Sequence, residues 1–196
     1  RILRDALDDE ELENHVRVIE ERTATLSRLS DEARTVSSLF DSESSTETTC
    51  DVTQSLTEVV EEVSETYPEA TVTVQDSGPV HVRADSRLKI ALRELLENAI
   101  LHNDQPRPAV TVTTRPSDGA RSGEWVDIVI SDNGPGIPEH EQATIETAEE
   151  TPLQHSTGFG LWIVYWTVSL FGGEVSIRDN EPRGTRVVLL LPRGSN

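Results

Sequence analysis

The sequence predicts a two-layer α/β sandwich preceded by a long helix that belongs to a dimeric helical bundle. Three observations lead to this fold class. Residues 10–40 contain neither Gly nor Pro, and their apolar or small positions recur by three and four. Residues 41–50 are polar and rich in Ser and Thr, which is typical of a linker. From residue 51 onward, strand-like runs of mixed type are interleaved with long helical patterns, which favours helices packed on one face of a sheet.

The apolar and small residues of the helix expected over 10–40 form a stripe that is narrow and long. A lone hairpin could not bury it, so we expect a bundle, and a dimeric one. The alternative is a helix that packs on its own domain. Residues 1–7 resemble the end of a preceding helix. The stripe consists of Leu12, Val16, Ile19, Thr23, Leu26, Ser30, Ala33, Ser37 and Phe40.

The second part of the chain carries the start and stop signals of a folded α/β domain. Asp51 can cap a helix that runs to about Glu65, and Tyr67-Pro68 ends it. Asp85 or Ser86 can cap a second helix that runs to His102. Residues 138–157 show no clear period and are interpreted as a mobile lid with some helix. The remaining expected elements are strands over 71–75, 80–83, 109–114, 125–131, 174–178 and 185–191, and a helix over 160–171.

Composition limits the class of protein and its partners. The 196 residues suffice for one domain with a sizeable core plus a smaller element. The formal net charge is -19 and Lys89 is the only lysine, so we expect adaptation to a high-salt cytosol, as in a halophilic archaeon. An acidic proteome that prefers Arg is the alternative. The same charge excludes nucleic acid as the main partner, because no basic stripe is present to neutralise phosphates.

The ends of the chain and its cysteine content carry less information. The chain starts at Arg1 and contains no Met, so we expect a fragment of a longer protein. Cys50 is the only cysteine, which excludes an intrachain disulfide. No apolar run reaches the length of a membrane span. Membrane contact is therefore expected only if upstream regions supply it, and this part should be cytoplasmic.

The helix before residue 102 places polar side chains on one face. Glu94, Asn98 and His102 are spaced i, i+4 and i+8 and therefore share that face. Asn98 offers a neutral amide oxygen, which suits one coordination position of Mg²⁺ when phosphates and waters fill the others. Taken alone, this pattern is better explained as the exposed face of an amphipathic helix. The apolar residues Leu92, Leu95, Leu96, Ala99 and Ile100 lie mostly on the other side, toward the sheet.

Two glycine-containing blocks follow this helix. Asp132-Asn-Gly134-Pro-Gly136 comes after an apolar strand, and its glycines let the backbone turn tightly. An ordinary strand-ending turn is the alternative. Gly158-Phe-Gly160-Leu opens a helix, where free N–H groups and the helix dipole bind phosphate oxygens. No Gly-Lys-Ser/Thr follows, so this block is not a P-loop. The three blocks together indicate a nucleotide pocket.

The order and spacing of these blocks resemble the Bergerat-type ATP-binding domain of gyrase, a class of heat-shock chaperones, MutL and sensor histidine kinases. Residues 51–192 carry the resemblance, which is closest to the histidine kinases. It implies that Asn98 is the protein ligand of Mg²⁺ and that Asp132 accepts a hydrogen bond from the exocyclic amine of adenine. It also implies that the hydroxyl of Thr185 supports this aspartate.

The resemblance extends to the residues around the phosphates. It implies that Gly134 and Gly136 approach the base, and that Gly158, Gly160 and Leu161 belong to the part that closes over the triphosphate. His102 either donates to a phosphate oxygen or merely ends its helix. Glu94 could act as a general base toward a hydroxyl, water or imidazole proton, so it does not separate a kinase from an ATPase.

The resemblance also implies a domain organisation and a function. Residues 1–45 would be part of a dimerisation and histidine-phosphotransfer hairpin, with its second helix over about 10–40, and residues 51–196 would be the catalytic domain. The intact protein would be a homodimer that moves the γ-phosphoryl of ATP to a histidine and then to an aspartate of a response-regulator receiver domain.

One expected feature of a histidine kinase is missing from this chain. The family's His-Glu/Asp block followed by Pro-Leu is not present, and the surroundings of His15 do not match it. We therefore expect the phosphoacceptor upstream of Arg1, so that this fragment binds Mg-ATP without phosphorylating itself. The alternatives are an ATPase of the gyrase, chaperone or MutL kind that uses Glu94 for hydrolysis, and a non-catalytic dimerisation module.

Overall fold

The chain divides into two compact units, Arg1–Ser42 and Glu43–Asn196. In the first unit, residues 15–19 are helical. Residue 23 is helical as well, whereas the other residues of the helix expected over 10–40 and the expected lid, with Gly158, lie outside the described residues. No helix within the described part of the chain is long and apolar enough to cross a membrane. The residues that the computed structural model describes are 15–19, 23, 49–75, 78–117, 124–137 and 159–195.

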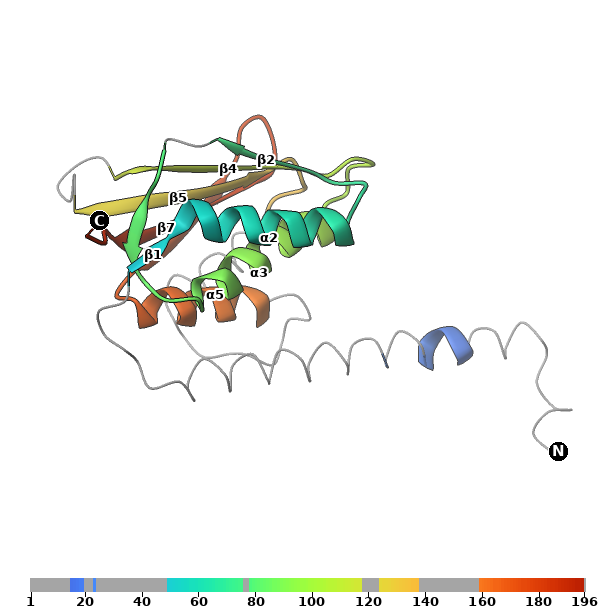
Figure 1. Ribbon diagram of the computed structural model, residues 1–196. Helices are drawn as coiled ribbons and strands as arrows, with labels where there is room; N and C mark the ends of the chain where they lie inside the picture. Colours follow the sequence, from blue (N-terminus) through green and yellow to red (C-terminus); the bar gives the residue numbers. More distant parts are fainter. Residues whose placement is uncertain are drawn as a thin grey trace, which may run out of the picture. The chain divides into compact units, whose positions relative to one another are not determined.

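The second unit is built on a five-stranded sheet with the order β2-β4-β5-β7-β6 (Figure 1). The pair β2–β4 is parallel, whereas the other three pairs are antiparallel. The sheet is therefore mixed, as the sequence predicts. Its strands are β2 (Thr71–Gln75), β4 (Ala109–Pro116), β5 (Trp125–Asp132), β6 (Glu174–Asp179) and β7 (Thr185–Pro192).

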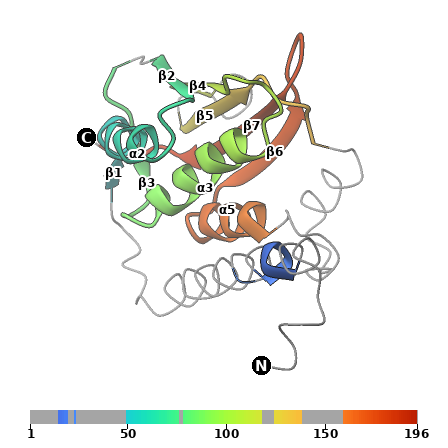
Figure 2. The same cartoon turned by 90° about the vertical axis from the view of Figure 1, so that its right-hand side faces the viewer.

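Three helices cover one face of this sheet, as Figure 2 shows. They are α2 (Val52–Thr66), α3 (Leu88–Leu101) and α5 (Phe159–Leu170). The central helix α3 packs on both α2 and α5. Its apolar residues face the sheet as predicted, with the exception of Ala99, which is only half-buried. The architecture is the two-layer α/β sandwich that the sequence predicts, and burial of this face is its main stabilising term.

Asp51 caps α2 as predicted. Its Oδ1 accepts hydrogen bonds from the backbone N–H groups of Thr53, at 2.9 Å, and Gln54, at 3.2 Å. These bonds satisfy two of the donors that a helix start leaves without intrahelical partners.

The sequence prediction misses a small second sheet. Strand β1 (Thr49–Asp51) pairs antiparallel with β3 (His81–Arg83), although Thr49 and Cys50 were assigned to the linker. The strands expected on either side of Gly78 consequently belong to different sheets. Strands of three residues are too short for their hydrophobic period to be recognised in a sequence.

The start of α3 also differs from the prediction. The helix begins at Leu88, and neither Asp85 nor Ser86 is its N-cap residue. Asp85 instead accepts a hydrogen bond from the backbone N–H of Arg87, at 2.8 Å, and forms an ion pair with its guanidinium group at 2.7 Å. That guanidinium group lies 5.6 Å from the centroid of the Phe171 ring, so it joins the start of α3 to the chain just after α5.

Candidate nucleotide-binding site

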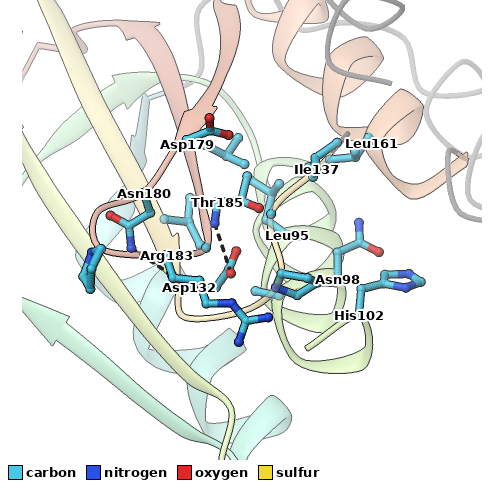
Figure 3. Close-up of a pocket in the computed structure, with 17 residues that line it drawn as sticks. Leu95, Asn98, His102, Asp132, Ile137, Leu161, Asp179, Asn180, Arg183 and Thr185 are labelled. Atoms are coloured by element: carbon cyan, nitrogen blue, oxygen red, sulfur yellow. Dashed lines mark hydrogen bonds between the residues drawn. The ribbon is translucent and has the colours of Figure 1, made fainter. Parts of the chain in front are cut away.

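A cavity of about 750 Å³ opens between α3, the start of α5, the turn after β5 and the turn that joins β6 to β7 (Figure 3). Its walls include the apolar residues Leu95, Ile130, Ile137 and Val187. A cavity of this size suits a nucleotide-sized ligand, and its apolar wall suits a planar ring. Of the residues that the sequence singles out, the cavity is lined by Asn98, His102, Asp132, Gly136, Leu161 and Thr185.

At one end of the cavity, the Asp132 carboxylate is held by backbone donors. Its Oδ1 accepts hydrogen bonds from the N–H of Gly134, at 2.7 Å, and from the N–H of Thr185, at 3.1 Å. The donors reach it because Asp132 ends β5 and Thr185 begins the neighbouring strand β7. The contact from Thr185 comes from its backbone, whereas the resemblance implies its hydroxyl. We call this the base end of the cavity, defined by Asp132, Gly134 and Thr185.

The turn between β6 and β7 packs closely against Asp132. Asn180 Nδ2 donates to the backbone oxygen of Asp132 at 2.8 Å. Gly184 has a φ of +110°, and a Cβ added there would lie 2.0 Å from the same oxygen. A side chain at position 184 would therefore force the turn away from Asp132. Gly136 also has a positive φ, +88°, so the predicted turn after β5 needs glycine for conformational reasons.

At the other end of the cavity, α3 and α5 meet closely. A Cβ added to Gly160 would lie 2.8 Å from Glu94 Oε2 and 2.9 Å from Asn98 Nδ2. The structure thus brings together the three residues Glu94, Asn98 and Gly160 from two of the predicted blocks. The absence of a side chain at Gly160 lets α5 begin against the polar face of α3. We call this the cation end of the cavity.

The Asn98 side chain has an unusual environment. Its Nδ2 is buried and has no hydrogen-bond partner in the part of the chain that the structure describes. A buried amide that remains unpaired costs about 1–3 kcal/mol. Such a group next to a cavity fits a polar ligand that pairs with the carboxamide when it binds. The donor set therefore fits a phosphate group with a divalent cation, for which a neutral amide oxygen is a suitable ligand.

His102 lies at the C-terminal end of α3, where its backbone N–H donates to the oxygen of Asn98 at 3.1 Å. Its side chain lines the cavity, as Figure 3 shows. His102 thus ends the helix and also lines the cavity, while its donation to a phosphate oxygen stays a prediction.

Several polar residues around the base end are not identified by the sequence analysis. Asn180 and Arg183 line the cavity from the β6–β7 turn. Arg183 forms an ion pair with Asp104 that lowers the pKa of this carboxyl. The turn composition around Pro182 predicts a tight turn, but no local signal shows that this turn contacts Asp132.

Comparison with known proteins identifies the family. The model of the family described as "Histidine kinase-, DNA gyrase B-, and HSP90-like ATPase" matches residues 83–195, which is more than half of the chain. The chain belongs to this family, and its fold is the Bergerat-type sandwich that the sequence resembles. The matched segment contains the whole described cavity.

Curated relatives of this chain include sensor histidine kinases. The chain is 35% identical over 123 residues to the sensor histidine kinase PdtaS of Mycobacterium tuberculosis, which covers 62% of this chain and 22% of PdtaS. It is 34% identical over 115 residues to the methanogenesis regulatory histidine kinase FilI of Methanothrix harundinacea, which covers 57% of this chain and 12% of FilI. The chain thus spans about a fifth or less of these relatives.

Solved structures show the same fold. The mycobacterial sensor histidine kinase MprB aligns with a TM-score of 0.62 at 25% identity and covers 76% of this chain and 99% of the MprB chain. Full-length ShkA in complex with AMPPNP aligns with a TM-score of 0.70 at 22% identity and covers 97% of this chain and 40% of the ShkA chain. The second unit therefore has the fold of histidine kinase catalytic domains.

Proposed function

We propose that this domain binds Mg-ATP and that the intact protein is a sensor histidine kinase. It transfers the γ-phosphoryl group to a histidine upstream of this chain and then to an aspartate of a response-regulator receiver domain. The observation that carries the proposal is the buried Asn98 Nδ2, which has no hydrogen-bond partner among the described residues, on a side chain that lines the same cavity as the Asp132 carboxylate. The names of the relatives support the kinase assignment.

The two ends of the cavity have different roles in this proposal. Asp132 accepts a hydrogen bond from the exocyclic amine of adenine, which disfavours guanine because guanine has a carbonyl at that position. Asn98 supplies one oxygen ligand to Mg²⁺. When it is bound, Mg²⁺ neutralises charge that develops on the transferred phosphoryl group. The catalytic contribution of the protein is mainly positioning and charge stabilisation.

The remaining residues enclose the phosphates. The backbone N–H groups at the start of α5, with Gly158, Gly160 and Leu161, bind phosphate oxygens without lysine. His102 donates to a phosphate oxygen from the end of α3. The acidic surface of the chain is suited to high salt, in which counterions screen its self-repulsion.

Glu94 is compatible with two enzymatic activities. Its carboxylate lies beside Gly160 at the cation end, where it could polarise either an incoming imidazole or a water molecule. In the kinase, Glu94 polarises the imidazole of the phosphoacceptor histidine upstream of this chain. The same placement also favours a second candidate function, an ATPase that uses Glu94 to activate water.

Nucleotide titration and phosphoryl analysis test the proposal. In molar salt, the chain should bind a non-hydrolysable ATP analogue more tightly with Mg²⁺ than without it, as measured by calorimetry. A longer chain that includes the upstream region should incorporate the γ-phosphoryl group as an acid-labile, base-stable phosphohistidine. Steady ADP release by this chain, abolished in Glu94→Ala, would replace the kinase with the ATPase. A folded chain that ignores adenine nucleotides would refute both and favour a non-catalytic dimerisation module.

A further inference from the structure

We infer that Asn103 and Asn133 form a bridge that sets the distance between the base end and the cation end of the cavity. Both are positioning residues, because neither lines the cavity in the part of the chain that the structure describes. The inference rests on the proposed function, since the spacing matters only if one nucleotide reaches both ends.

Asn103 is anchored to the helix that carries Asn98. It follows the C-terminal end of α3, and its Nδ2 donates to the backbone oxygen of Ala99 at 3.2 Å. The same Nδ2 donates to Asn133 Oδ1 at 2.9 Å, while Asn103 Oδ1 accepts from the N–H of Gln105 at 3.0 Å. Both amide hydrogens are thus used, one on the helix and one on the turn after β5.

Asn133 anchors the other side of the bridge. It lies between Asp132 and Gly134 and is therefore part of the turn that holds the base-recognising carboxylate. Its Oδ1 accepts from the N–H of Ala109 at 2.9 Å as well as from Asn103. The turn is consequently tied both to the first residue of β4 and to the end of α3.

The bridge lies close to the backbone of the turn. A Cβ added to Gly134 would be 3.3 Å from Asn103 Nδ2 and 3.0 Å from Asp132 Oδ1. The glycine therefore lets the carboxamide of Asn103 and the carboxylate of Asp132 approach from two sides. Because α3 holds Asn98 and the turn holds Asp132, a shift of the turn relative to α3 changes the span that a bound nucleotide must match.

The test compares nucleotides that use both ends of the cavity or only one. Asn103→Ala and Asn133→Ala should each lower the affinity for Mg-ATP about tenfold. Each should also reduce the preference for ATP over GTP, while binding of adenosine, which contacts only the base end, should change less. The double variant should lose little more than either single variant, because both remove the same bond.

Two further variants separate positioning from general damage. Asn133→Asp keeps the oxygen that accepts the hydrogen bond from Asn103. Its preference for ATP over GTP should therefore stay close to that of the wild type. If the substitution only destabilised the turn, this preference would fall instead. Gln105→Ala lies in the same loop and leaves the Asn103–Asn133 bond in place, so its nucleotide affinities should stay at wild-type values. Circular dichroism and thermal unfolding in molar salt identify any variant that fails to fold.

The outcomes distinguish the bridge from the function on which it rests. If the wild-type chain binds no ATP, the proposed function fails. If the wild type binds ATP with a base preference and Asn103→Ala keeps both affinity and preference, only the bridge is refuted. Strictly additive losses in the double variant would refute it as well.

Discussion

The two ends of the cavity differ in how completely the protein satisfies its own polar groups. At the base end, Asp132 Oδ1 accepts two backbone N–H bonds and the backbone oxygen of Asp132 accepts a third bond, from Asn180. At the cation end, Asn98 Nδ2 is buried and has no hydrogen-bond partner in the described part of the chain. The base end is thus held by the protein's own donors, whereas in the proposed function the ligand completes the cation end.

This difference suggests a division of tasks. A carboxylate held by rigid backbone donors discriminates between bases, because the cost of a wrong partner cannot be relieved by movement. An unpaired amide gives up stability in the free state and regains it when ligand groups pair with it. Variants at the base end should therefore affect the fold, selectivity or both, and variants at the cation end should affect binding alone.

The largest expected effect is at Gly184, whose substitution would disturb the fixed end. Gly184→Ala should lower the free energy of unfolding by about 3–4 kcal/mol, because it combines a positive φ with a backbone overlap. The matched control is Gly78→Ala. Gly78 has a similar φ of +99° but no atom within 4 Å of the added Cβ, so about 1 kcal/mol is expected. Denaturant titration measures both, and equal losses would show that the turn does not press on Asp132.

Asn98→Ala tests the end that the ligand completes. The variant should lose about 100-fold in affinity for Mg-ATP and should lose the effect of Mg²⁺, because a cation ligand is removed. Its free energy of unfolding should stay unchanged or rise slightly, since an unpaired buried amide disappears. Calorimetry with and without Mg²⁺, combined with thermal unfolding, checks both parts. Mg-dependent affinity that survives the substitution would contradict the role of Asn98.

Asp132→Asn tests the selectivity of the fixed end. The new side chain can still accept the two backbone N–H bonds through its oxygen, so the fold should persist. Its amide nitrogen would then face the base as a donor, which should reduce the preference for ATP over GTP by about tenfold. Competition between the two nucleotides for a fluorescent analogue measures this ratio. An intact preference would count against the contact between Asp132 and adenine.

The sequence predicts the regular elements of the second unit well, and the reasons are local. The helix from residue 52 has a capping aspartate, and β4 alternates between buried and half-exposed positions along most of its length. The face formed by Glu94, Asn98 and His102 also follows from helical spacing alone. Local spacing does not, however, reveal pairing between distant segments, which is why β1 and β3 were not recognised as a sheet.

The candidate site is predicted only in part, for the same reason. The three blocks with chemical signatures are visible in the sequence, and the structure brings Asn98, His102, Asp132, Gly136 and Leu161 from these blocks to one cavity, which Glu94, Gly134 and Gly160 do not line. Asn103, Asn180 and Arg183 are not recognisable because their roles depend on contacts 30 to 79 residues away in the chain. An isolated asparagine or arginine in a polar turn carries no sign of such a contact.

The smallest expected effect is that of Glu97→Gln on the free energy of unfolding. Because Glu97 and Asn98 are neighbours in α3, this variant should change stability without changing nucleotide binding. Burial raises the pKa of Glu97, which is adjacent to Asn98 but does not line the cavity within the described residues. A raised pKa in the folded state means that stability is greatest below the ordinary glutamate pKa of 4.5 and falls as pH rises through the folded pKa. Glu97→Gln should therefore stabilise the domain at pH 7, by at most about 0.5 kcal/mol because the side chain is half-exposed.

The control for this variant is its affinity for Mg-ATP. Mg-ATP affinity should not change in Glu97→Gln, in contrast to the loss expected for Asn98→Ala one position away.

Burial and the charges of Glu97 and Glu69 raise the pKa of Tyr67, so the variant should also lower the pKa of this phenol, as measured by ultraviolet absorbance. The stability gain should disappear as the pH falls toward 4, because Glu97 then becomes neutral in both states. A gain that persists at low pH would mean that it does not arise from the burial of a charge.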